Sequence, residues 1–370
     1  MAYEGKIVKE FVPNKQNARN SEGAFIRMDD GSIAFVYSRY RIGSTDGATC
    51  DLAVSYSFDE GETFSEGKVI LTPEECDAMN LMSVSLFRLN DGFIALYYLK
   101  KSKGAQCVPY MRKTKDFVSF SDEIRCIKDE GYFVVNNDRV RRLKNGNLIF
   151  SAAYHPLDER QGAVDHDSKH LKLRYGIGKV YLSKDEGETW EETCEIDMPY
   201  EYFKTVRDAG LQEPGVIELD DGSIYMYFRC NVGRQLESYS YDGGYTFTTP
   251  IPSRFTSPPS PMSTLRLSDG NILIGYNPIP FYPGRYEGEN GHWTGGRNPF
   301  VIEIADGNMK TIVPVRSIER DEKSGYCYCA MFETKDGVLL GYCAGGENDE
   351  GGCLTRLRIR KILKEELYSE

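Results

Sequence analysis

The chain has 370 residues, of which 40% are hydrophobic and 12% aromatic, and its formal net charge is −11. An acidic protein without a Lys/Arg-rich stripe is not expected to bind nucleic acid. The first residues, MAYEGKIVKEFVPNK, lack the apolar stretch of a secretory signal, and the longest apolar runs, such as FIALYYL at 93–99, are too short to span a membrane. We therefore expect no membrane partner and a cytoplasmic location, unless an export signal has been removed.

Six segments of the chain repeat one pattern: an apolar run, then Asp-Gly or Asn-Gly, then a second apolar run. Such a dipeptide between apolar residues is the strongest short-range signal for a β-hairpin, because both turn residues need positive φ. In chain order the predicted hairpins are FIRMDDGSIAFVY (25–37), LFRLNDGFIALYY (86–98), VRRLKNGNLIFSAAY (140–154), VIELDDGSIYMYF (216–228), TLRLSDGNILIGY (264–276) and MFETKDGVLLGYC (331–343).

The spacing of these hairpins predicts the fold. Their turn glycines follow one another at steps of 61, 54, 76, 48 and 67 residues, which leaves room for two more strands in each unit. Six four-stranded units of this kind stack radially. We predict an all-β fold, a six-bladed β-propeller of four-stranded antiparallel blades, with residues 1–370 forming one domain. A pair of β-sandwiches is the alternative, although it accounts less well for six equivalent hairpins.

One octapeptide, Ser-x-Asp-x-Gly-x-Thr-aromatic, occurs three times. The copies are SFDEGETF (57–64), SKDEGETW (183–190) and SYDGGYTF (240–247), and they follow the first, third and fourth hairpins. Asp and Gly at this spacing form a tight turn in which the carboxylate accepts hydrogen bonds from backbone N–H groups. We therefore predict a structural turn that holds the blades together, in preference to calcium ligation.

These three copies resemble the Asp-box, or bacterial neuraminidase, repeat, and nearly the whole chain resembles the sialidase superfamily of six-bladed propellers. The resemblance implies a glycoside hydrolase that needs no cofactor. The octapeptide also occurs in propellers that are not sialidases, so evidence for the site has to come from other residues.

The repeat itself indicates where a site would lie. Equivalent positions in a propeller form a ring around the axis, so a polar set at one strand end would line a central pocket. The residues nine positions before the turn glycines are Glu22, Ser83, Asn137, Glu213, Pro261 and Tyr328.

Two members of this ring match the catalytic pattern of sialidases, in which a tyrosine is the nucleophile and a glutamate its base. Glu213 in QEPGVIELDDG resembles that glutamate, and Tyr328 in GYCYCAMFETKDG resembles that tyrosine. Tyr326 lies on the same strand face and stays an alternative. A neutral phenol suits this chemistry, because a carboxylate beside the anomeric carbon repels an anionic nucleophile.

The resemblance also implies three arginines that hold the carboxylate of the sugar. Arg229, at the end of SIYMYFRC, matches the second, and Arg297 in GGRNPF resembles the third, with Arg285 as a weaker alternative. Hairpin register would bring Arg229 back beside Glu213. A guanidinium suits this role because its planar fork binds a carboxylate bidentately.

The first hairpin departs from the family pattern. Sialidases carry Arg-Ile-Pro at its start, whereas this chain reads ARNSEGAFIRMDDG, with Glu22 near the place of the first arginine. Arg19 is close but out of register, Arg39 in YSRY is expected to pair with Glu22 across the hairpin, and Arg139 in NNDRV is a candidate to rebuild the clamp. We count Glu22, Arg39, Asn137 and Arg139 as candidate substrate-binding residues.

The general acid of the family is an aspartate in the loop after the first hairpin. The stretch RYRIGSTDGATCDLAVS offers Asp46 and Asp51. We favour Asp46, since a Gly-rich loop can lower it over a pocket, whereas Asp51 begins a strand.

Cysteine and histidine give no sign of a metal site. The ten cysteines are scattered without a C-x-x-C pair, which favours buried reduced thiols. Three of the four histidines (His155, His166 and His170) lie in YHPLDERQGAVDHDSKH without a helical ligand spacing, which favours a solvated loop.

The predicted function is therefore that of a glycoside hydrolase acting on a glycan or sugar-acid substrate, with retaining exo-α-sialidase chemistry as the leading form. Tyr328 would be the nucleophile, Glu213 its base and Asp46 the acid/base. The alternatives are a propeller glycosidase or lyase acting on a different acidic or neutral sugar, and a glycan-binding propeller without catalysis.

Overall fold

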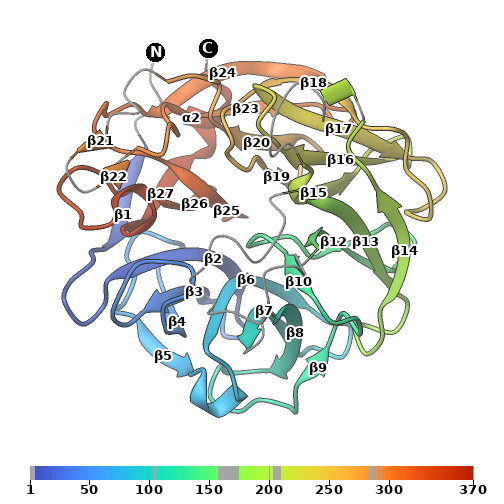
Figure 1. Ribbon diagram of the computed structural model, residues 1–370. Coiled ribbons are helices and arrows are strands. Elements are labelled where there is room, and N and C mark those ends of the chain that lie inside the picture. The colour runs from blue at the N-terminus through green and yellow to red at the C-terminus, as the bar shows by residue number, and fades with distance from the viewer. Residues whose placement is uncertain are drawn as a thin grey trace.

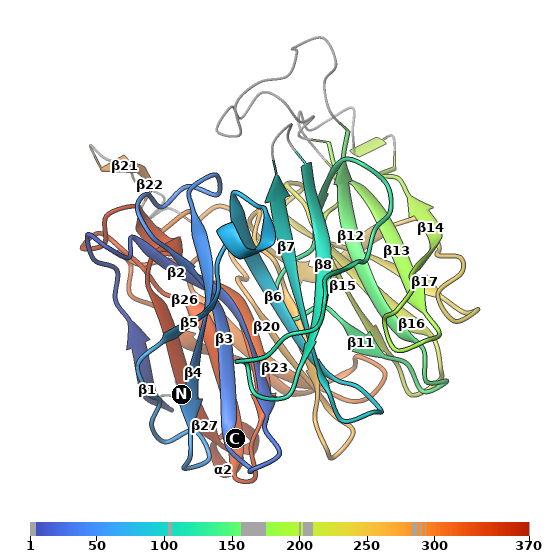
Figure 2. The same ribbon diagram turned by 90° about the horizontal axis from the view of Figure 1, so that it is seen from below.

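The computed structural model describes residues 5–102, 106–156, 175–199, 201–202, 210–282, 287–288, 291–292 and 294–369. Its strands form six antiparallel blades around a central axis (Figure 1). From the side, the strands of neighbouring blades run in roughly the same direction, so each blade has one end at each face of the molecule (Figure 2). The predicted six-bladed propeller is confirmed.

The six blades follow one another along the chain. Blade I contains β2 (Arg19–Arg27), β3 (Ile33–Tyr40), β4 (Cys50–Ser57) and β5 (Lys68–Leu71), and blade II contains β6 (Asn80–Arg88), β7 (Ile94–Ser102), β8 (Gln106–Thr114) and β9 (Ile124–Arg125). Blade III contains β11 (Arg141–Arg142), β12 (Leu148–His155), β13 (Ile177–Ser183) and β14 (Glu191–Ile196), and blade IV contains β15 (Gln212–Glu218), β16 (Ile224–Arg229), β17 (Arg234–Ser240) and β18 (Ile251–Thr256). Blade V contains β19 (Ser263–Arg266), β20 (Ile272–Tyr276), β23 (Phe300–Ala305) and β24 (Thr311–Glu319).

Blade VI closes the ring with strands from both ends of the chain. It contains β25 (Cys327–Glu333), β26 (Gly337–Cys343) and β27 (Leu357–Leu363), and its outer strand is β1 (Lys6–Phe11), which pairs antiparallel with β27. This pairing joins residues 6–11 to residues 357–361 and completes the last four-stranded sheet without a further hairpin. A short helix, α2 (Lys364–Tyr368), follows β27.

One additional strand joins blades II and III into a continuous sheet. β10 (Tyr132–Val134) pairs parallel with β8 of blade II and antiparallel with β12 of blade III. The structure also has a two-stranded ribbon, β21 (Glu287–Gly288) and β22 (Gly291–His292), within the β20–β23 connection of blade V.

All six predicted hairpins form, but the turns differ from the expected type. In the first hairpin the Met28 N–H donates to the Ser32 carbonyl, and Gly31 alone of the turn residues has positive φ, at 87°. This is a three-residue loop in which the glycine takes the left-handed position. The expectation that both residues of Asp-Gly have positive φ is wrong here, because the longer loop lets Asp30 keep an ordinary φ and accept a hydrogen bond from the Ser32 N–H.

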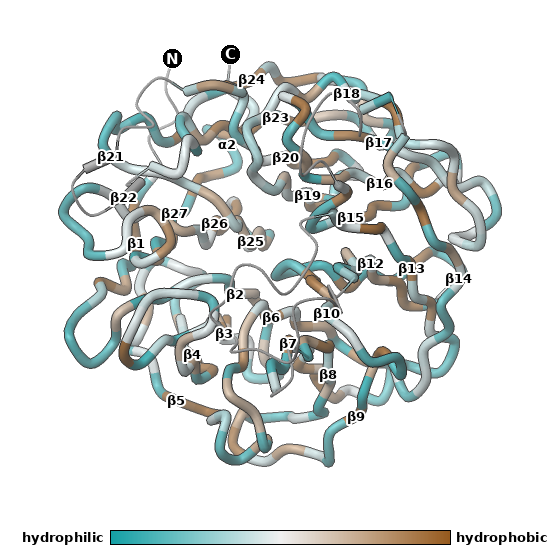
Figure 3. The backbone as a smooth tube through the Cα atoms, viewed as in Figure 1, coloured by the Kyte–Doolittle hydropathy of each residue, from teal (hydrophilic) through white to brown (hydrophobic). Residues whose placement is uncertain are grey.

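The core lies between the blades. A separate cluster of buried apolar side chains fills each of the six interfaces between neighbouring blades, and the cluster between blades VI and I includes Phe11 of β1. The strands carry most of the hydrophobic segments, whereas many of the outer loops are hydrophilic (Figure 3). Each blade therefore depends on both neighbours for burial of its two faces. Among the described residues, no helix has the length and apolar character that crossing a membrane requires.

The octapeptides form turns between the third and fourth strands of blades I, III and IV. In the copy in blade III, Asp185 accepts hydrogen bonds from the backbone N–H and the hydroxyl of Thr189 and from the hydroxyl of Ser183. The next residue, Glu186, accepts from Arg142 of the same blade and from the Asn90 N–H of blade II. The octapeptide is thus a turn that also joins two blades, as predicted.

We expect Asp185→Ala to lower the free energy of unfolding by about 1 to 3 kcal/mol, because three donors lose their acceptor. The measurement is a denaturant titration, with Asp242→Ala, the same change in blade IV, as a matched variant. The activity predicted from the sequence should not change per folded molecule, because these turns lie at the hairpin end of the blades. A normally stable but inactive Asp185→Ala protein would contradict this assignment.

Candidate active site

The inner strands of four blades carry the same backbone irregularity at one end. Glu22, Ser83, Glu213 and Tyr328 have positive φ values of 53°, 56°, 42° and 57°, and each lies in a break in the register with the next strand. A bulge of this kind redirects a side chain, and left-handed non-glycine residues concentrate at functional sites. The bulges direct these four side chains to the axis, where all four line one cavity.

This cavity has a volume of about 450 Å³ and lies at the end of the strands opposite the hairpin turns. Its polar lining comes from blades I to IV and VI and from the connections between strands. The ionisable or polar residues among those that line it are Glu22, Asp46, Ser83, Lys101, Cys107, Tyr132, Asn136, His155, Gln212, Glu213, Arg229, Asn231, Arg297 and Tyr328. The volume is that of a small-molecule site.

Tyr328, Glu213 and Arg229 form a hydrogen-bonded group in the cavity. The Tyr328 hydroxyl donates to Glu213 Oε1 at 2.8 Å, and Arg229 Nη1 donates to Glu213 Oε2 at 2.7 Å and to the Tyr328 oxygen at 3.3 Å. Burial and the Glu213 charge raise the pKa of Tyr328 well above its ordinary value, against the effect of Arg229 and Arg297. Tyr328 is therefore a neutral phenol in contact with a carboxylate that can accept its proton.

Arg297 lies over the Tyr328 ring, with its guanidinium carbon 5.2 Å from the ring centroid. It is buried, and its Nη1 donates to Cys327 Sγ at 2.9 Å. Among the residues that the structure describes, no carboxylate forms an ion pair with Arg297. Although burial raises the pKa of Cys327, hydrogen bonds with Cys343 and Cys353 and the Arg297 charge lower it well below its ordinary value.

Asp46 reaches the cavity from the loop between β3 and β4. Its side chain is 62% exposed and accepts a hydrogen bond from Arg19. Two buried side chains of blade II hold the backbone of this loop, because Lys101 Nζ donates to the Asp46 carbonyl at 2.7 Å and Asn80 Nδ2 to the Ala48 carbonyl at 2.6 Å. These two hydrogen bonds hold the loop that carries Asp46 next to the cavity.

Asp51 and Tyr326, the alternatives to Asp46 and Tyr328, lie outside the cavity. Asp51 is buried at the start of β4, where Arg41 binds its carboxylate through Nε and Nη2. Tyr326 packs in the core between blades V and VI against the ring of Tyr342. Neither Asp51 nor Tyr326 is among the residues that line the cavity.

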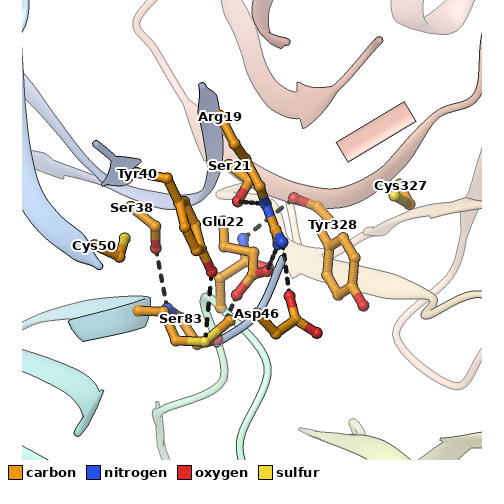
Figure 4. A network of polar contacts seen from close by, with 12 residues as sticks. Arg19, Ser21, Glu22, Ser38, Tyr40, Asp46, Cys50, Ser83, Cys327 and Tyr328 are labelled. Carbon is orange, nitrogen blue, oxygen red and sulfur yellow. Dashed lines mark hydrogen bonds and ion pairs between the residues drawn. The ribbon is translucent and has the colours of Figure 1, made fainter. Parts of the chain in front are cut away.

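The Glu22 carboxyl lines the cavity and lies close to Arg19 and Ser83 (Figure 4). Its Oε1 accepts from Arg19 Nη2 at 2.7 Å, and its Oε2 accepts from the Ser83 hydroxyl. The Arg19 guanidinium also stacks over the Tyr40 ring, at 4.5 Å from the centroid. Arg19, which seemed out of register in the sequence, is therefore the partner of Glu22, because the bulge at Glu22 shifts the strand by one residue.

Three predicted substrate-binding residues do not line the cavity. Arg39 lies 3.9 Å from Asp51, so the expected pairing with Glu22 is wrong. Asn137 is buried, and its amide donates to the carbonyls of Gly23 and Tyr328. Arg139 donates to the Met262 carbonyl and faces the ring of Tyr227, so it joins blades III, IV and V.

Several cavity residues were missed in the sequence, although a signal for them exists. Lys101, His155 and Asn231 each follow the turn glycine of their hairpin by nine residues, at the far end of the second strand. Counting nine residues after the glycine works as well, because the hairpin brings that position back beside the end of the inner strand that holds the position nine residues before it. Arg285 lies outside the described residues.

All ten cysteines are free thiols, and nine of them are buried. Among the described residues, no three His, Cys, Asp or Glu side chains are arranged to hold a metal ion. His166 and His170 lie outside the described residues.

Fold and cavity define a six-bladed propeller of the BNR-repeat type with a polar cavity on its axis. The chain matches the family described as BNR repeat-like domain over residues 36–340 and belongs to that family. No curated protein is similar enough in sequence to count as a match.

Solved structures support the fold over nearly the whole chain. A protein of unknown function from Dyadobacter fermentans is 17% identical, with a TM-score of 0.70 over 98% of this chain and 99% of the other. The NanB sialidase from Streptococcus pneumoniae is 13% identical (TM-score 0.69, 98% and 71%), and the intramolecular trans-sialidase from Ruminococcus gnavus is 13% identical (TM-score 0.68, 99% and 98%). At these identities the likeness concerns the fold.

Proposed function

We propose that the chain is a retaining glycoside hydrolase that removes a terminal sugar acid from a glycan, with exo-α-sialidase chemistry. One observation carries this proposal: the neutral phenol of Tyr328 donates a 2.8 Å hydrogen bond to Glu213 inside a cavity that also holds Arg229 and Arg297. The paired phenol and carboxylate form a nucleophile and its base, which agrees with the activities named for two of the similar structures.

In the first step the Tyr328 oxygen forms a bond to the anomeric carbon while its proton passes to Glu213. The bond from that carbon to the leaving oxygen breaks, and Asp46 supplies the proton that the oxygen needs. In the second step Asp46 takes a proton from water, the water oxygen replaces Tyr328 at the anomeric carbon, and Glu213 returns the proton to the phenol. Two displacements leave the configuration retained.

The test is a screen of the purified protein against fluorogenic aryl glycosides that include α-sialosides and neutral sugars. We expect turnover of the α-sialoside, with the product released first in the α configuration when the reaction is followed by NMR. Hydrolysis of a neutral glycoside alone, or release of the β product, would contradict the proposal.

A second candidate is supported by one observation. Glu22 lies in the cavity near the place where the family pattern has an arginine, and it brings a carboxyl group to a site for a carboxylate. This favours a propeller glycosidase or lyase whose substrate is a different acidic sugar or a neutral one. The same screen distinguishes it by the glycoside that is turned over.

A further inference from the structure

Three of the buried thiols lie together beside Arg297. Cys327 begins β25 and Cys343 ends β26, and the two residues are directly opposite each other in the antiparallel ladder of blade VI. Cys353 comes from a different segment, the short 3₁₀ helix Gly352–Leu354. The Cys327 sulfur forms hydrogen bonds with both of the other thiols, so Cys327 is the central member of this cluster.

The backbone fixes the spacing of Cys327 and Cys343. Opposed residues of an antiparallel ladder have Cα atoms about 4.5 to 5.5 Å apart, and a relaxed disulfide needs about 4.4 to 6.8 Å. Cys353 meets the ladder differently, because its carbonyl accepts a hydrogen bond from the Gly345 N–H at 3.2 Å, two residues beyond Cys343. Cys343 is therefore the better placed partner for a covalent bond to Cys327.

The surroundings of Cys327 favour the reactive form of its thiol. Arg297 Nη1 donates to its sulfur at 2.9 Å, and the Tyr326 N–H donates to the Arg297 carbonyl at 2.9 Å, which ties this arginine to the start of β25. Burial raises the pKa of Cys327, but hydrogen bonds with the two neighbouring thiols and the Arg297 charge outweigh it and hold the pKa well below its ordinary value. The thiolate is the nucleophile in cysteine chemistry.

The cluster lies directly behind residues of the cavity wall. Cys327, Tyr328 and Cys343 form one buried apolar group, and Leu354 packs against it. Tyr328, Leu354 and Arg297 all line the cavity, whereas none of the three thiols does. A reagent that reaches Cys327 in the folded protein therefore has to be small and uncharged, as hydrogen peroxide is.

We propose that Cys327 is a site of oxidation by hydroperoxides, that it forms a disulfide with Cys343, and that this bond weakens the contact between Cys327 and Arg297. The modification lies outside the proposed reaction and does not depend on the proposed function.

The chemistry needs only the two thiols and the peroxide. The Cys327 thiolate attacks one peroxide oxygen, so an S–O bond forms, the O–O bond breaks and hydroxide leaves. The Cys343 sulfur then attacks the Cys327 sulfur, so the S–S bond forms and the S–O bond breaks. The departing oxygen takes the Cys343 proton and leaves as water. In sum two thiols and one hydrogen peroxide give one disulfide and two waters.

Oxidation would change what Arg297 offers to a ligand. In the reduced protein its charge is shared with the Cys327 sulfur, whereas neither sulfur of a disulfide can be ionised. An anionic ligand would then compete with a weaker acceptor. This consequence rests on the proposed function, since the ligand is the carboxylate of a sugar acid. We expect the preference for a planar unsaturated sialic acid analogue over its carboxamide to be at least about threefold greater in the oxidised protein.

The experiment treats the reduced wild-type protein with hydrogen peroxide, alkylates the remaining thiols and maps the products by mass spectrometry. We expect the loss of two hydrogens from the intact chain and one disulfide, between Cys327 and Cys343, which dithiothreitol reverses. Cys343 and Cys353 share one tryptic peptide, so a second cleavage after the acidic residues 347–350 is needed to tell them apart.

Cys343→Ser removes the second thiol. We expect this variant to form no such disulfide and to carry a sulfenic acid at Cys327, which dimedone traps. Cys329→Ser is the matched control, because Cys329 lies two residues along β25, in the core between blades V and VI, where burial raises its pKa. This control should form the disulfide at the wild-type rate.

The inference would be overturned by a folded wild-type protein in which peroxide leaves Cys327 unmodified, or by a bond from Cys327 to Cys353. If Cys343→Ser fails to fold, the wild-type peptide map decides between the same outcomes. A complete disulfide with an unchanged acid-to-amide ratio would contradict its effect on Arg297. Lack of binding by both redox forms would overturn the proposed function alone, because the disulfide is measured without a ligand.

Discussion

Tyr328→Phe and Glu213→Gln are each expected to lower kcat by about 100-fold or more on an aryl α-sialoside, with the fold intact. Tyr328→Phe removes the attacking oxygen, and Glu213→Gln removes the group that accepts its proton at 2.8 Å. Because the two side chains act in one step, the double variant should be little slower than the slower single variant. Steady-state kinetics on variants with wild-type circular dichroism and thermal stability provide the measurement.

The matched control is Tyr326→Phe, which removes a tyrosine hydroxyl two residues away in the sequence. Tyr326 lies in the core between blades V and VI and does not line the cavity, so kcat should stay near that of the wild type. Full activity of Tyr328→Phe, together with loss of activity in Tyr326→Phe, would show that the nucleophile has been assigned to the wrong tyrosine.

The fold could be predicted from the sequence because it repeats. The Asp-Gly and Asn-Gly turns mark the same point in six blades, and a position fixed relative to one turn is fixed in all of them. Counting back from these glycines selected Glu22, Ser83, Glu213 and Tyr328, which do line the cavity. The method worked because the structure places a bulge at the same point of these four strands.

The partners of these residues could not be predicted in the same way, because they depend on where a strand gains a residue. Alternation along an unbroken strand puts Arg19 out of register with Glu22 and brings Arg39 opposite the same region. The bulge between Ser21 and Ala24 changes which side chains face the axis, so Arg19 pairs with Glu22 and Arg39 lies near Asp51. Asn137 and Arg139 do not line the cavity for a related reason. In blade III the residue with positive φ is Asp138, which lies between them.

The Asp46 loop shows a second limit of reasoning from the sequence. Its composition suggested a loop that could lie over a pocket, but nothing local indicated that Lys101 and Asn80 of the next blade hold its backbone. Such contacts join residues more than 30 positions apart, and they arise only when two blades pack. The contact between Arg297 and Cys327, 30 positions apart, likewise joins neighbouring blades.

Arg297→Ala is expected to remove most of the preference of the cavity for an acid over an amide. In the wild type we expect the planar unsaturated sialic acid analogue to bind at least about 30-fold more tightly than its carboxamide, which has the same shape without the charge. The reason is that Arg297 is a buried cation that donates to Cys327 Sγ and has no carboxylate partner among the described residues, so a ligand carboxylate would provide an ionic partner that an amide does not. Calorimetry with both ligands, at the pH of tightest binding, measures the ratio.

Arg39→Ala is the matched control for charge. It also removes one guanidinium, but Arg39 lies near Asp51 and does not line the cavity. Its acid-to-amide ratio should equal that of the wild type, whereas the ratio for Arg297→Ala should fall toward one. Part of the acid's affinity could remain through Arg229, but that guanidinium is already engaged at 2.7 Å by Glu213 and offers less to a ligand. Equal wild-type affinity for acid and amide would therefore exclude a carboxylate as the group that Arg297 binds and would favour a neutral sugar as the substrate.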